Sequence, residues 1–117
     1  MSNLGISGHA FAKAKAEGRG ALVGYLPVGY PSVAGSLDAM RALCGQGDRP
    51  GVDLVEVGMP YTDPVLDGPV IQRAGTAALD RGVRTRDVFA AVEAVVATGT
   101  PAVVMTYWNL VDHYGVD

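Results

Sequence analysis

Two carboxylates, Glu56 and Asp67, have the surroundings that best suit chemistry in this chain. Glu56 lies near the end of the aliphatic segment 52–57, and Asp67 comes directly before Gly68 and Pro69. An ionised carboxylate among aliphatic side chains is costly to desolvate unless it is paired or its pKa shifts. Two carboxylates in unlike surroundings can divide acid and base roles. If both face one cavity, the pair predicts proton transfer.

Each carboxylate also has a structural interpretation, which the residue pattern leaves open. Glu56 could pair with a Lys or Arg at the rim of a sheet, since buried carboxylates also serve structural ion pairs. Asp67 could hydrogen-bond the first amides of a helix that begins at Gly68-Pro69. Asp63 precedes Pro64, a pattern that is typical of turns.

Two tyrosines, Tyr25 and Tyr107, end two other predicted strands. A tyrosine at such a place either packs as an amphipathic side chain or contacts a ligand, and Trp108 and Asn109 carry the same ambiguity. The sequence shows no metal-ligand spacing among its His, Cys and carboxylate residues. It also lacks a Gly-rich phosphate loop of the nucleotide-binding types.

The elements that must position these residues alternate between strands and helices. Apolar periodicity, Gly and Pro stops and a Ser32 cap predict a leading helix over 9–17, strands over 21–26, 52–57 and 101–105, helices over 32–45, 69–82 and 85–98, and a loop over 107–113. Alternation of this kind predicts right-handed crossovers and a parallel sheet. Within the middle strand, Val55 and Val57 should face one way and Glu56 the other.

Length, charge and composition narrow the class of protein. The chain has 117 residues, 49% of them hydrophobic, which predicts a single packed domain over 1–117. The net charge of −3 argues against a nucleic-acid surface. No apolar run approaches the roughly 20 residues that span a bilayer, and no secretory signal is visible. With Cys44 as the lone cysteine, we expect a cytoplasmic protein.

The segment 55–69, which reads VEVGMPYTDPVLDGP, closely resembles the signature of the tryptophan synthase alpha chain family. Segments 25–31 and 104–109 resemble the family's first and third strands with their loops, in the style of actinobacterial members. The similarity extends from about residue 8 to residue 117. It implies a TIM (β/α)8 barrel with a leading helix, of which this chain holds about three β/α units, so that residues 1–117 form one incomplete barrel domain.

The resemblance also implies an activity, a lyase step in tryptophan biosynthesis. In that family, indole-3-glycerol phosphate is cleaved by a retro-aldol reaction to indole and glyceraldehyde 3-phosphate. Glu56 matches the catalytic acid/base, and Asp67 matches the carboxylate that holds the indole N–H. Tyr25 and Tyr107 match residues that line the substrate pocket.

The resemblance further implies a partner, the tryptophan synthase β chain in an α2β2 heterotetramer. Pro60, Asp63 and Asn109 match positions that face this partner. We expect no cofactor on this chain, because pyridoxal phosphate belongs to the β chain by the same resemblance.

Two functional hypotheses from different classes follow. A barrel of this kind needs about 250 residues, and the family's phosphate-binding loops follow later strands. The chain is therefore either the N-terminal part of a lyase or a short, inactive product that binds a β chain or itself. We expect the first, because a third strand without its covering helix is an unusual domain boundary.

Overall fold

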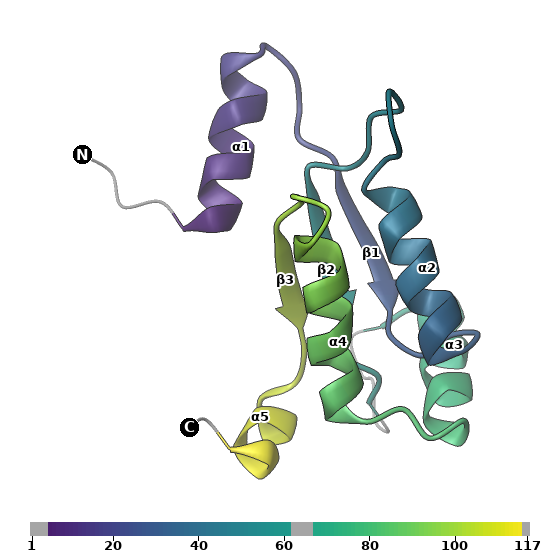
Figure 1. The fold of residues 1–117 in the computed structure, drawn as a ribbon. Coiled ribbons are helices and arrows are strands. Elements are labelled where there is room, and N and C mark those ends of the chain that lie inside the picture. Colours follow the sequence, from purple (N-terminus) through teal and green to yellow (C-terminus); the bar gives the residue numbers. More distant parts are fainter. Residues whose placement is uncertain (1–4, 62–66, 116–117) are drawn as a thin grey trace.

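A computed structural model describes residues 5–61 and 67–115. Its centre is a parallel sheet of three strands in the order β1-β2-β3 (Figure 1). The elements follow one another as α1 (Ile6–Ala16), β1 (Val23–Pro27), α2 (Val33–Leu43), β2 (Leu54–Gly58), α3 (Pro69–Asp80), α4 (Thr85–Val96), β3 (Ala102–Met105) and α5 (Trp108–Tyr114). The predicted alternation and the parallel sheet are thus confirmed.

Local signals in the sequence locate most element boundaries. The Ser32 side chain accepts a hydrogen bond of 2.9 Å from the Gly35 N–H, which confirms Ser32 as the N-cap of α2. Pro69 stands in the first turn of α3, where its missing N–H costs nothing. The leading helix begins at Ile6, earlier than predicted, because Gly5 is its extended N-cap and accepts from the His9 N–H.

The predicted loop over 107–113 is wrong, because a short helix occupies most of it. Tyr107 is the extended N-cap residue of α5, and its carbonyl accepts a hydrogen bond from the Leu110 N–H at 3.1 Å. No Gly or Pro interrupts the segment until Gly115, whose φ of 108° ends the helix. Aromatic and polar residues such as those of this segment are compatible with one or two helical turns as well as with a loop.

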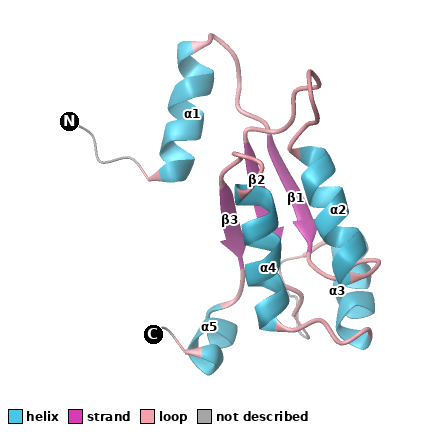
Figure 2. Ribbon diagram, in the orientation of Figure 1, coloured by secondary structure: helices cyan, strands magenta, loops and turns pink. Residues whose placement is uncertain are grey.

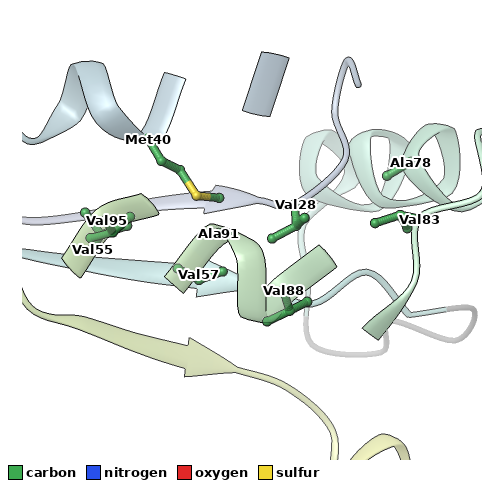
Figure 3. Close-up of a cluster of buried hydrophobic side chains, with 9 residues drawn as sticks. All are labelled: Val28, Met40, Val55, Val57, Ala78, Val83, Val88, Ala91 and Val95. Carbon is green, nitrogen blue, oxygen red and sulfur yellow. The ribbon is translucent and has the colours of Figure 1, made fainter. Parts of the chain in front are cut away.

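The hydrophobic core lies between one face of the sheet and the helices α2 and α4, which cover it in Figure 2. Val55 and Val57 point into this core from β2 and are both fully buried. Their partners in Figure 3 come from α2, α3, α4, the loop after β1 and the loop between α3 and α4, namely Val28, Met40, Ala78, Val83, Val88, Ala91 and Val95. Burial of an aliphatic side chain contributes about 1.5–3 kcal/mol, so this layer holds β2 in place.

A buried serine ties the end of β1 to α2. The Ser36 hydroxyl accepts a hydrogen bond from the Gly29 N–H at 2.9 Å and donates one to the Val33 carbonyl at 2.8 Å. Only 1% of Ser36 is exposed. Because a buried polar group without a partner is costly, this pair of bonds fixes the loop that follows β1.

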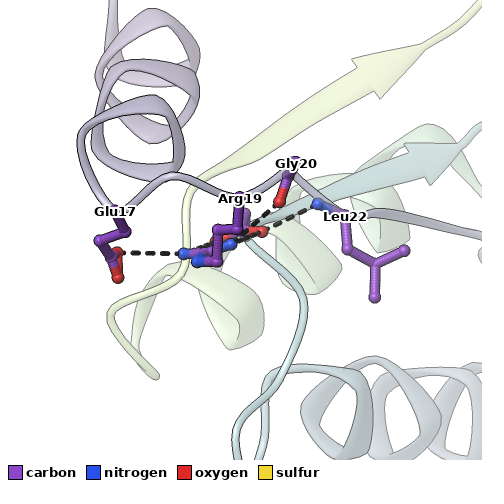
Figure 4. Close-up of polar contacts among 5 residues, drawn as sticks. Glu17, Arg19, Gly20 and Leu22 are labelled. Carbon is purple, nitrogen blue, oxygen red and sulfur yellow. Dashed lines mark hydrogen bonds and ion pairs between the residues drawn. The ribbon is translucent and has the colours of Figure 1, made fainter.

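An ion pair fastens the opposite, N-terminal end of the sheet (Figure 4). The Arg19 guanidinium binds both oxygens of Asp53 at 2.9 Å and also contacts Glu17 at 3.3 Å. The Leu22 N–H donates to the Asp53 carboxylate at 2.8 Å. These donors, Arg19 first, lower the pKa of Asp53 to about 2. The segment between α1 and β1 is therefore tied to the start of β2.

No helix within the described ranges is long and apolar enough to cross a membrane.

Candidate functional site

Glu56 and Tyr25 lie side by side on neighbouring strands. The register of the parallel sheet pairs Tyr25 of β1 with Glu56 of β2, and Glu56 with Val103 of β3. Registered residues of parallel strands point to the same face. Since Val55 and Val57 face the helices, Glu56 points to the opposite face, as predicted, and it is half-buried there.

Asp67 is brought towards Tyr25 by the chain that leads into α3. Tyr25 and Asp67 both line a small hollow, together with Pro27, Met59, Pro60, Tyr61, Ile71, Gln72 and Gly75. The Gln72 side-chain amide donates to the Asp67 carbonyl at 2.8 Å. Gly68, and not Asp67, is the N-cap residue of α3. Asp67 therefore lies one residue outside the position that its structural interpretation required.

Tyr25 adjoins both carboxylates, because it is paired with Glu56 in the strand register and shares the hollow with Asp67. Its pKa is raised, first by burial of the phenol and then by the negative charges of Asp67 and Glu56, with a smaller effect of Tyr107. A charge acts on a neighbour in this way only at short range. The strand register, the shared hollow and the stack of Tyr61, which lines that hollow, on Tyr107 thus bring Glu56, Asp67, Tyr25 and Tyr107 together.

Glycine at position 58 allows Tyr25 to take this place. A Cβ atom on Gly58 would lie 2.2 Å from the Tyr25 hydroxyl oxygen and 2.6 Å from Cζ. The ring thus lies directly against the backbone at the end of β2. Sequence reasoning did not identify Gly58 as a site residue, because its only role is to leave space for a side chain from another strand.

Tyr61 is a second residue that the sequence analysis missed. Its ring stacks on that of Tyr107, with centroids 4.5 Å apart and planes 24° apart. The two rings come from the loops after β2 and β3. The signal that could have identified Tyr61 was its place just after a strand end, the same position that pointed to Tyr25 and Tyr107.

The structure places two of the three residues that were predicted to face a partner, Pro60 and Asn109. Pro60 is half-buried and lines the hollow beside Tyr25. Asn109 belongs to α5 and not to a loop. Asp63 lies outside the described residues. Interaction with a partner therefore stays a prediction for all three.

The hollow between Tyr25 and Asp67 holds only about 10 Å3, hardly room for one water molecule. A larger ligand would have to lie over the open face of the sheet beside Glu56, where 36% of Val103 is exposed. Among the described residues, no group of three His, Cys, Asp or Glu side chains is arranged to hold a metal ion.

Comparisons with known proteins agree with the arrangement of the elements. The family model described as "Tryptophan synthase alpha chain" matches residues 11–117. A tryptophan synthase alpha chain of Salinispora arenicola is 56% identical over 117 residues, which is all of this chain and 41% of that relative. One of Mycobacterium tuberculosis is 56% identical over 110 residues, 94% of this chain and 39% of the relative. The chain thus spans about two fifths of the length of these relatives.

Solved structures give the same result. A crystal structure of tryptophan synthase from M. tuberculosis in its open form superposes with a TM-score of 0.87 at 55% identity, over 92% of this chain and 42% of that one. A mutant tryptophan synthase alpha-subunit from Pyrococcus furiosus superposes with a TM-score of 0.72 at 35% identity, over 82% and 38%.

Proposed function

Because the chain belongs to the tryptophan synthase alpha chain family, with the fold of part of a (β/α)8 barrel, we propose that it carries the proton-transfer residues of a lyase. The substrate is indole-3-glycerol phosphate, and the products are indole and glyceraldehyde 3-phosphate. One observation carries this proposal: Tyr25 is paired with Glu56 in the strand register and lines the same hollow as Asp67, so the two carboxylates flank one half-buried tyrosine.

The cleavage needs a proton at one carbon and the removal of a proton from one hydroxyl. The Glu56 carboxyl delivers a proton to the indole carbon that bears the glycerol chain. The bond between this carbon and the chain then breaks, its electron pair restores the aromatic ring, and the chain hydroxyl loses its proton to become an aldehyde. Glu56, as carboxylate, accepts that proton and is ready for another turnover.

Asp67 acts on the nitrogen of the same ring. Protonation of the carbon places positive charge on the indole nitrogen. A carboxylate that accepts a hydrogen bond from this N–H stabilises the charge where it develops. Asp67 meets this need because it follows β2 in a loop, at the C-terminal end of the strands, where barrel enzymes hold their chemistry.

The aromatic and partner-facing residues complete the proposal. Tyr25 and Tyr107 line the space for the indole ring, and Pro60, Asp63 and Asn109 face a β chain in an α2β2 assembly in the cytoplasm. Residues 1–117 form part of a single barrel domain. The support for these assignments is the family membership together with the grouping of Tyr25, Tyr107 and Pro60 at one end of the sheet.

The test is indole release from indole-3-glycerol phosphate by the full gene product. We expect Glu56→Gln to lower kcat by about 10²–10⁴-fold and Asp67→Asn by about 10²–10³-fold. Both substitutions keep the shape of the side chain and remove its charge. Matched controls are Glu93→Gln on α4 and Asp80→Asn on α3, which change exposed carboxylates away from the site. A kcat within twofold of the parent in either site variant would contradict the assigned role.

A second candidate function is binding without catalysis, to a β chain or to another copy of the chain. It is favoured by the aliphatic side chains that stand exposed on β3, with 40% of Val104 and 53% of Met105 accessible. The intact mass of the natural product separates the two candidates. A product near 12.1 kDa that binds a β chain and releases no indole would support the binding function.

A further inference from the structure

Two tyrosine rings close one side of the site by stacking on each other. Tyr61 follows the end of β2, and Tyr107 follows the end of β3, so the stack joins loops that are far apart in the chain. Both side chains are half-buried. Tyr61 also lines the hollow that contains Tyr25 and Asp67. Tyr61 therefore shares a hollow with Asp67, a proposed catalytic residue, and stacks on Tyr107, a proposed substrate-lining residue.

The stack has a consequence for the orientation of Tyr107. This residue is the extended N-cap of α5 and follows the end of β3. A half-exposed tyrosine at a strand end can take several rotamers. A ring that faces it at 4.5 Å, inclined by 24°, restricts it to one plane, and such aromatic pairs are favourable beyond their buried area.

A second contact holds the same two loops together. The Thr106 hydroxyl donates a hydrogen bond of 3.1 Å to the Met59 sulfur. Met59 lies two residues before Tyr61, and Thr106 lies one residue before Tyr107. The Met59 N–H also donates to the Met105 carbonyl at 3.0 Å. The backbones that carry the two rings are thus coupled, so the rings meet in a fixed register.

We propose that Tyr61 is a positioning residue that, by stacking on Tyr107, fixes the aromatic wall against which the planar ring of the substrate lies. This inference rests on the proposed function and adds a residue to it. Tyr61 need not touch the reacting atoms. Its effect should therefore fall on binding of the aromatic ring and leave the proton-transfer step nearly unchanged.

The kinetic test compares Tyr61→Leu with Tyr61→Phe in the full gene product. Loss of one aromatic pair corresponds to about a three- to tenfold change in affinity. We expect Tyr61→Leu to raise KM for indole-3-glycerol phosphate by this factor while kcat stays within twofold, the pattern of lost uniform binding. Tyr61→Phe keeps the ring and should recover most of the loss. The effect should also disappear in a Tyr107→Leu background, because the two residues act together.

The chain supplies a matched control for loss of an aromatic pair. Phe89 and Tyr114 form an edge-to-face contact with centroids 5.4 Å apart, on α4 and α5 and away from the carboxylates. Phe89→Leu removes a comparable pair and should leave KM unchanged. If Phe89→Leu raised KM as much as Tyr61→Leu, the effect would be general destabilisation and the inference would be overturned.

A binding measurement separates failure of this inference from failure of the proposed function. Titration of indole, followed by the NMR signals of labelled tyrosine rings, gives a dissociation constant without turnover. Tyr61→Leu should weaken indole binding three- to tenfold and shift the Tyr107 ring protons as the facing ring current is lost. A parent protein that binds indole but does not release it from the phosphate ester would refute only the lyase proposal. Unchanged indole affinity and an unchanged Tyr107 signal in Tyr61→Leu would refute the role of Tyr61.

Discussion

The contact between Tyr25 and Gly58 allows a quantitative prediction about the site. In Gly58→Ala, the new methyl group would stand 2.2 Å from the Tyr25 hydroxyl oxygen, 2.6 Å from Cζ and 2.8 Å from Cε2. Carbon and oxygen atoms pack at about 3.5 Å, so the tip of the ring must move by about 1 Å. The main-chain conformation at Gly58 is not of the left-handed type, and the penalty is therefore steric.

Two magnitudes follow from this displacement. The atoms in contact lie at the far end of a side chain that can swing, so we place the loss of unfolding free energy at about 1 kcal/mol, the low end for overpacking. Activity should suffer more, because a misplacement of about 1 Å at an active site can cost 10²-fold. We expect kcat/KM for indole release to fall by about 10- to 100-fold.

The assay pairs urea unfolding with indole-release kinetics on the full gene product, and Gly75→Ala serves as the control. A Cβ atom on Gly75 would meet only the Pro60 Cβ at 3.9 Å, an ordinary contact. Gly75→Ala should therefore raise stability by about 0.5–1 kcal/mol, since Gly in a helix interior is unfavourable. In a Tyr25→Leu background the ring is absent, so Gly58→Ala should cost little. An equal cost in both backgrounds, or a parent-like Gly58→Ala variant, would refute the steric argument.

Two further predictions concern the framework that holds the site. Ser36→Ala should lower the unfolding free energy by about 1–3 kcal/mol in urea titrations, because the buried Gly29 N–H loses its acceptor. The control Ala39→Ser, at an exposed position of the same helix, should change the unfolding free energy little. Equal effects of the two substitutions would contradict the role of the buried hydrogen bond. The pKa of Asp53 is about 2 in the folded chain and about 4 in the unfolded chain. The stabilising effect of the Asp53 carboxylate is therefore complete above pH 4 and is lost as the pH falls towards 2. Urea midpoints between pH 5 and pH 2 should consequently fall more steeply for the parent than for Asp53→Asn, and parallel curves would show that the Arg19 contact is absent in solution.

Much of the fold could be predicted because its signals are local. The Ser32 cap, Pro69 in the first turn of α3 and the glycines after the helices act within a few residues of themselves. The strand period placed Val55 and Val57 on one face and Glu56 on the other, and the packing of both valines in the core beneath α2 and α4 confirms this arrangement. The family signature in residues 55–69 identified Glu56 and Asp67 as candidates before any geometry was known.

Local signals were weaker where two structures compete for the same segment. The helix α5 was predicted as a loop because aromatic and polar residues suit either state, and the position of Gly115 decides where a helix can end. Asp67 looked like a helix cap by its position, but the cap is Gly68. For Asp67, a shift of one residue, beyond the precision of sequence patterns, changed the interpretation.

The sequence by itself determined the order of the elements and the faces of β2, and it pointed to Glu56 and Asp67 as candidates for proton transfer, because each of these depends on residue types and short spacings. Only the tertiary structure decided which residues meet. Tyr25 faces Glu56 through the strand register, Gly58 leaves room for the Tyr25 ring, and Tyr61 stacks on Tyr107. These contacts join segments separated by long stretches of chain. Their geometry follows from how α2 and α4 pack on the sheet, and no local pattern encodes that packing.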